Sequence, residues 1–125
     1  MDRAHRNEAG MVTAETALVL PIVTAFVMTL VWLISVGISE VRLVDVARDA
    51  ARAIARGDDE DSVEAYVAAR GPRGAQIDVT RSGNDVTVDV AMVAEAPGWL
   101  LIPLPGIDLR ATATTEAEVA SDAAW

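Results

Sequence analysis

The 125-residue sequence contains no cysteine, and His5 is its single histidine. Without cysteine the chain has no disulfide, no thiolate metal site and no thiol nucleophile, although this says little about its compartment. Because one histidine in a polar N-terminal segment cannot supply a Ser-His-Asp triad or a histidine metal centre, conventional catalytic sites are excluded. We therefore expect no enzyme activity, no catalytic residue and no cofactor.

Basic residues are also scarce: ten arginines and no lysine face nineteen acidic residues, which gives a net charge of -9. Such a charge removes the electrostatic basis for nucleic-acid binding. The acidic run 58–61 (DDED) could in principle collect a hard cation, but it lacks the glycine and the distal glutamate of a calcium loop. We interpret these acids as favouring a helix dipole, and we expect no metal site and no small-molecule substrate.

What the sequence has in excess is one long uncharged stretch. Between Glu15 and Glu40 lie 24 residues without a charged side chain, and 17 of them are apolar. At about 1.5 Å per residue this helix would be roughly 36 Å long, enough for a hydrocarbon core of about 30 Å. A cleaved signal peptide is the alternative, but its apolar region is usually about 7–15 residues long. We predict a retained transmembrane helix.

The helix is predicted to continue past the apolar stretch. Residues 40–56 (EVRLVDVARDAARAIAR) contain no glycine or proline, and Gly57 is a natural stop. Leu43, Ala47, Ala50 and Ile54 form a narrow apolar stripe. A single helix over residues 11–56 would measure about 69 Å.

Beyond Gly57 the pattern predicts a small domain, residues 57–125. Asp61 and Glu64 have the spacing of a capping box, and Gly71-Pro72 ends the short helix that follows. Three runs then alternate between apolar and polar residues, the first two being joined by a turn at residues 82–85. The alternating residues are Ile77 and Val79; Val86, Val88, Val90 and Met92; and Leu109, Ala111, Ala113 and Thr115. The expected fold class is α+β, with a short helix and a three-stranded antiparallel sheet beyond the long helix.

Residues 96–105 (APGWLLIPLP) form an apolar loop that contains three prolines. We expect Trp99, Leu100, Leu101 and Ile102 to fold back over the stripe from Leu43 to Ile54 and complete a thin core. The alternative is a contact with a partner subunit or with the membrane surface.

The most informative motif stands at the entrance to the apolar stretch. A polar leader, residues 1–10, ends in Gly10, and Glu15 follows five residues later. This arrangement resembles the processing site of type IV prepilins and pseudopilins, which a prepilin peptidase cuts after the glycine. The longer segment Gly10 to Pro21 (GMVTAETALVLP) resembles the opening of TadE-like proteins, minor pilin-like components of the tight-adherence (Flp) pilus system; Thr16 departs from the family, in which a large residue is usual there.

The resemblance implies a pilin-like fold and a structural function: a membrane-anchored minor pilin or pseudopilin in assembly of a Flp-type, type IV-like pilus or a related secretion apparatus. It implies three kinds of partner, namely the membrane, a prepilin peptidase and other pilin-like subunits. Cleavage would expose the amine of Met11, one helical turn from Glu15, and the two could pair within a subunit or between neighbours. Alternatively, Glu15 caps the helix start and Gly10 forms a plain turn.

Pro21 is the last of the four residues to which we assign a processing or assembly role, with Gly10, Met11 and Glu15. Proline removes the backbone hydrogen bond to the carbonyl of Ala17 and is expected to bend or loosen the helix. A loosened segment could help a subunit leave the bilayer.

Orientation is predicted with two opposing signals. Near the span, two arginines precede the apolar stretch (Arg3 and Arg6) and five are counted after it, so the positive-inside rule alone would place the C-terminal part in the cytoplasm. The five are Arg42, Arg48, Arg52, Arg56 and Arg70. The interleaved acids and the processing-site resemblance favour the reverse. We predict a single-pass cell-membrane protein, or a subunit of the pilus itself, with a cytoplasmic N-terminus and an extracytoplasmic domain. The alternative function is a secreted small binding domain with a cleaved signal peptide.

Overall fold

The computed structural model describes residues 2–100 and 103–117, and side-chain surroundings from His5 onward. The element order is helix α1 (Asp2–Ala55), helix α2 (Glu60–Arg70), and strands β1 (Gln76–Ser82), β2 (Asp85–Ala94) and β3 (Ile107–Glu116). The sheet is antiparallel with the order β1-β2-β3. This confirms the expected α+β fold.

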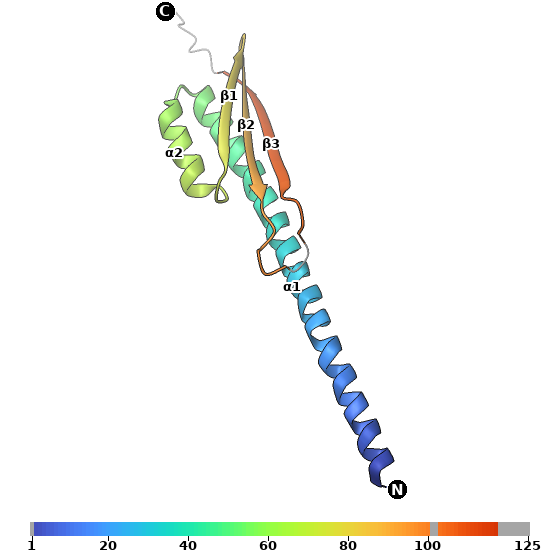
Figure 1. The fold of residues 1–125 in the computed structure, drawn as a ribbon. Coiled ribbons are helices and arrows are strands. Elements are labelled where there is room, and N and C mark those ends of the chain that lie inside the picture. The colour runs from blue at the N-terminus through green and yellow to red at the C-terminus, as the bar shows by residue number, and fades with distance from the viewer. Residues whose placement is uncertain (1, 101–102, 118–125) are drawn as a thin grey trace, which may run out of the picture.

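Helix α1 forms a long shaft, and the sheet and α2 pack against its C-terminal part (Figure 1). It has 54 residues, which corresponds to about 81 Å at 1.5 Å per residue. We expected the helix to begin at Met11, but it begins at Asp2, because the leader holds good helix formers and one glycine does not stop a helix.

The C-terminal end of α1 is closed at Gly57, as the sequence predicts. Gly57 adopts a φ of 94°, and its amide donates to the carbonyl of Ile54 at 3.0 Å. The amide of Asp58 donates to the carbonyl of Ala53 at 3.0 Å. These two bonds form a Schellman motif, which needs a left-handed residue at this position and therefore favours glycine.

The core lies between α1, α2 and one face of the sheet. All four residues of the predicted stripe are buried: Leu43, Ala47, Ala50 and Ile54. They are covered by two valines of α2 and by the inward residues of the sheet, with these members: Val63, Val67, Val86, Val88, Val90, Leu109 and Ala111. The small alanines of α1 let the sheet approach the helix closely, so a short domain still encloses a continuous core.

The first hairpin and the third strand agree with the predicted alternation. Ser82 pairs with Asp85, so the connecting loop is Gly83-Asn84, and Gly83 has a φ of 60°. A positive φ at the first loop residue fits a type II′ turn, which matches the twist of the strands. The other face of the sheet is polar; Thr87 and Thr114 bond across it at 3.1 Å, and Thr112 donates to Asp89.

Two sequence-based expectations about the domain are wrong. Helix α2 is capped by Asp59 and not by Asp61, and no side-chain capping bond is made. Three of the four consecutive acids are aspartates, each an acceptable cap, so spacing alone selects none of them. Trp99 also does not cover the stripe from Leu43 to Ile54, because the sheet and α2 already do; instead it lines a groove farther down α1. Leu101 and Ile102 lie outside the described residues.

Candidate functional site: the exposed N-terminal part of helix α1

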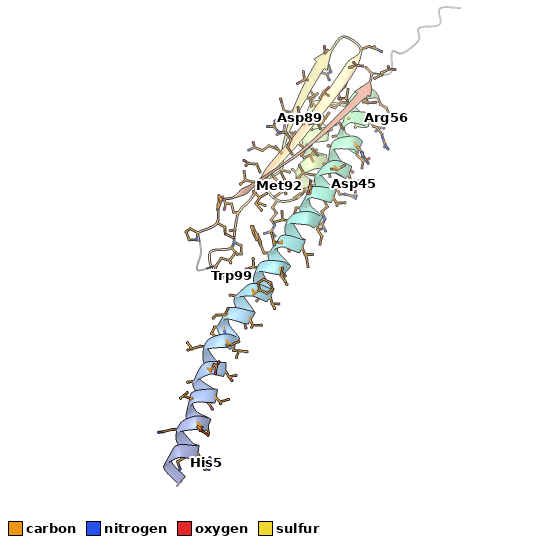
Figure 2. All side chains as sticks on the ribbon, turned by 90° about the vertical axis from the view of Figure 1, so that its right-hand side faces the viewer. His5, Asp45, Arg56, Asp89, Met92 and Trp99 are labelled. Carbon is orange, nitrogen blue, oxygen red and sulfur yellow. The ribbon has the colours of Figure 1, made fainter. Side chains whose placement is uncertain are left out.

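The four residues singled out by sequence, Gly10, Met11, Glu15 and Pro21, all lie on α1 within its exposed N-terminal part. Figure 2 shows that the shaft near His5 carries side chains that project from the helix without a neighbouring element, whereas Trp99 lies beside the helix farther along. Met11 is 73% exposed. The structure therefore brings the four residues onto one element, and Pro21 also lines a shallow apolar groove beside Trp99.

Gly10 is not required by the fold. It lies inside the helix, its φ is not positive, and a Cβ placed on it would meet no atom within 4 Å. The expected alternative, that Gly10 forms a plain turn before the helix, is therefore wrong. A glycine inside a helix costs about 1 kcal/mol relative to alanine, and here no packing contact offsets that cost.

Glu15 is exposed and lies in the interior of α1, thirteen residues after its first residue. In the chain as it stands, Glu15 cannot cap the helix start, because α1 begins at Asp2 and caps act within the first turn. Met11 precedes it by four residues, which places the two side chains on the same face of the helix. Both interpretations require cleavage after Gly10, because only cleavage would expose the Met11 amine and bring the start of the helix close to Glu15.

Pro21 does not interrupt α1. The helix is continuous through this residue, and Figure 1 shows no sharp bend along the shaft. The expected bend is therefore not observed. Proline still lacks the amide that would bond to the carbonyl of Ala17, so the local loosening stays a prediction.

The hydroxyl side chains of the apolar stretch are satisfied within the helix itself. Each donates to the backbone carbonyl four residues earlier, at 2.8 to 3.0 Å: Thr13, Thr16, Thr24, Thr29, Ser35 and Ser39. A polar group in hydrocarbon is costly unless it is bonded, so these contacts allow the five hydroxyls from Thr16 to Ser39 in a lipid-facing segment, and Thr13 lies just before it. The sequence gives the positions of these hydroxyl residues, but only the helical backbone shows that each hydroxyl can donate to a carbonyl of the same helix.

The acidic run beside α2 is used for ion pairs. Asp58 lies 3.4 Å from an Arg56 nitrogen, and Glu60 lies 2.6 Å from an Arg81 nitrogen. Across residues 2–100 and 103–117, no group of three or more potential metal ligands is found. The first pair lies within the connection between α1 and α2, and the second links the start of α2 to the end of β1, so these acids have a structural use.

A contact that the sequence did not suggest lies next to this run. The Tyr66 hydroxyl donates to Asp49 Oδ2 at 3.1 Å, and the Arg70 guanidinium lies 6.0 Å from the tyrosine ring centre. The hydrogen bond to Asp49 raises the pKa of Tyr66 above its ordinary value, and desolvation acts in the same direction. These residues link α1 to α2 on the surface.

The arrangement defines the class of protein. In the described part of the chain, α1 is the one helix long and apolar enough to cross a bilayer, and none of its most apolar window is buried. A bare apolar helix joined to a small α+β domain fits a single-pass membrane protein.

Comparison with protein families gives a more specific result. The model of the TadE-like protein family matches residues 10–52. The match confirms the resemblance inferred from Gly10 to Pro21, and it extends through the apolar stretch into the part of α1 that packs against the sheet. A search of the curated proteins and a search of the solved structures found no match. The match covers 43 of the 125 residues of the chain.

Proposed function

We propose that this chain is a minor pilin-like subunit that takes part in assembly of a Tad (Flp, type IV-like) pilus or a related secretion apparatus. In this proposal residues 1–10 are a leader, residues 11–56 form the membrane-spanning and continuing helix, and residues 57–125 form an extracytoplasmic domain. The N-terminus is cytoplasmic. The activity is packing, and no chemical reaction is assigned to the chain.

The observation that carries the proposal is the exposed apolar surface of α1. The residues from Met11 to Val31 are exposed almost throughout, whereas residues from Leu43 to Ala55 are largely enclosed by the domain. Such a surface is stable in lipid or against other apolar helices, and a subunit that moves from bilayer to filament exchanges one for the other. Satisfied hydroxyls keep the surface compatible with both environments.

Gly10 supports processing by a prepilin peptidase. The bond between Gly10 and Met11 lies within a continuous helix, so a peptidase must locally unwind the chain to reach it. Glycine weakens the helix there by about 1 kcal/mol relative to alanine and leaves the bond without a Cβ on one side. These properties suit a cleavage site and serve no packing contact.

Co-expression with a prepilin peptidase tests the proposal. We expect mass spectrometry to show loss of residues 1–10 and a new N-terminus at Met11, and we expect Gly10→Val to prevent this. The fold accepts a side chain at Gly10, so the loss would report on cleavage. Ala17→Val, at an exposed position beyond the bond, is the matched control and should be cleaved normally.

The same measurement separates the proposal from the secreted binding domain. An N-terminus near Ser39 would indicate removal of the whole apolar stretch by a signal peptidase. A full-length chain in the presence of an active prepilin peptidase would also contradict the proposal.

A further inference from the structure

The connection between β2 and β3 lies along the apolar stretch of α1 and not over the core. Trp99, at its turn, lies beside the helix (Figure 2). It lines a shallow apolar groove together with five residues of the helix: Leu20, Pro21, Thr24, Ala25 and Met28. All five belong to the stretch that fits a membrane span, so the connection reaches past the end of the domain toward the N-terminus of α1 (Figure 1).

The depth of this contact can be measured along the helix. The domain first packs against α1 at Val36, which is partly buried against the core. Met28 precedes Val36 by eight residues, or about 12 Å at 1.5 Å per residue. The hydrocarbon core takes up about 20 residues of helix, and the uncharged stretch runs from Thr16 to Ser39. The groove therefore lies inside the bilayer when α1 spans it.

The chemistry of the connection suits that position. No charged residue occurs between Glu95 and Asp108. Trp99 is 52% exposed and Leu104 is 39% exposed, so apolar surface remains uncovered by the protein. Irregular backbone in lipid is normally excluded because its amides lack partners. Here three of the residues are prolines, which have no amide hydrogen, and the amide of Leu100 donates to the carbonyl of Pro97 at 3.0 Å.

We propose that this connection, which we name the Trp99 loop (residues 96–100 and 103–106), enters the bilayer from the C-terminal side of the span and reaches its hydrocarbon core beside α1. Its partner is the lipid acyl chains, because the groove residues from Leu20 to Met28 lie well below the end of the uncharged stretch at Ser39. The loop thus gives the domain a second membrane contact beside α1 and fixes how the domain is turned about the helix axis. The inference rests on the membrane-spanning helix and not on the pilus function.

The test uses the full-length chain reconstituted at one copy per phosphatidylcholine nanodisc. Because the chain has no cysteine, Gly98→Cys introduces a single labelling site in the Trp99 loop, and a Cβ there meets no atom within 4 Å. Asn84→Cys, in the hairpin turn at the other end of the sheet, is the matched control. Each is labelled with an environment-sensitive fluorophore and quenched with nitroxide-labelled phosphatidylcholine. We expect quenching to be several-fold stronger at position 98 than at position 84.

A second variant tests whether the loop itself drives insertion. Adding Trp99→Glu to the Gly98→Cys chain should reduce the quenching to the control level, whereas Trp99→Phe should retain it. Neither change touches the core, so circular dichroism should be unaltered. Equal quenching at positions 98 and 84 would overturn the proposal, as would quenching that survives Trp99→Glu. Weak quenching at position 98 with one copy per nanodisc, together with burial of the fluorophore in nanodiscs that hold two copies, would also overturn the proposal. That result would identify a second copy as the partner.

Discussion

Glu15 has two interpretations, pairing with a new N-terminal amine or capping the helix start, and both apply to the chain after cleavage. In the chain that begins at residue 1, Glu15 lies within the helix and caps nothing. After cleavage at Gly10 the helix would begin at Met11, and the new amine would lie one turn from the carboxylate. An isolated charge in a bilayer costs several kcal/mol, so a pair formed there, within a subunit or with a neighbour, would favour assembly.

We predict that Glu15→Gln leaves cleavage after Gly10 intact but lowers pilus output, because the variant keeps size and hydrogen bonding and loses the charge. Filament yield at matched protein levels is the measurement. The matched control is Glu8→Gln, an exposed carboxylate of the same helix that cleavage would remove. Equal yields from the wild type and Glu15→Gln would contradict the pairing mechanism; a pure dipole effect is worth only about 0.3–1 kcal/mol.

Tyr66 offers a second test at the scale of one residue, and it reports on contact between α1 and α2. It is the one tyrosine of the chain, so absorbance at 295 nm follows its ionisation alone. The hydrogen bond to Asp49 holds the neutral phenol and raises its pKa above 10.0. The hydrogen bond from the neutral phenol to Asp49 therefore stabilises the folded chain at pH values below the unfolded-state pKa of tyrosine. This stabilisation is lost as the pH rises through the folded-state pKa of Tyr66.

We therefore expect a titration midpoint above 10.0 for the folded chain and a lower midpoint for Asp49→Asn. Asp45→Asn, which removes the same charge one helical turn earlier, should leave the midpoint where it is in the wild type. An unchanged midpoint in Asp49→Asn would show that the bond between α1 and α2 is not formed in solution.

At the scale of elements, one continuous helix serves two environments. Its N-terminal part is exposed and its C-terminal part forms the centre of the domain core. Leu43, which is 1% exposed, stands where the helix enters the domain, whereas Val41, two residues earlier, is 62% exposed.

We predict that Leu43→Ala lowers the opening free energy of the β2 amides by about 2–5 kcal/mol, because it leaves a cavity at the base of the core. Hydrogen exchange of the detergent-solubilised full chain measures this quantity. Val41→Ala should change it by less than about 0.5 kcal/mol. Similar effects of the two substitutions would mean that the domain does not pack on this face of α1.

The elements themselves were largely predictable because their periodicities differ. A 3.6-residue repeat indicates the stripe on α1, and a two-residue repeat indicates the three strands. The start of α2 was not predictable, because Asp59 and Asp61 are equally good caps. The position of the Trp99 loop was not predictable either. Apolar composition indicates that such a loop avoids water, but the core stripe and the bilayer satisfy that requirement equally well.

The sequence indicated which residues belong to the candidate site, but it did not indicate the backbone conformation around them. Gly10 and Glu15 are found by their spacing from the apolar stretch. Helix propensity alone does not decide whether one glycine stops a helix. For this reason the sequence did not show that Gly10 lies inside the helix or that Glu15 does not cap it in the uncleaved chain. The inward hydroxyl bonds and the contact between Tyr66 and Asp49 depend on backbone geometry and on the packing of α2.

At the scale of the whole molecule, the chain is a shaft with a small domain at one end (Figure 1). The arginine distribution and the processing-site resemblance predict opposite orientations for this shaft in the membrane. An extracytoplasmic domain is what an assembling pilus subunit requires, since its domain must reach the filament without crossing the bilayer after folding. Orientation is therefore the point on which the whole account depends.

Labelling of Asn84→Cys in intact cells with a membrane-impermeant maleimide measures this orientation most directly. Asn84 lies in the hairpin turn of the domain, and the chain has no other cysteine. Ala9→Cys, in the leader, is the matched control for the opposite side. The account predicts that position 84 reacts in intact cells and that position 9 reacts only after lysis. Reaction at position 84 only after lysis would place the domain in the cytoplasm and contradict the account.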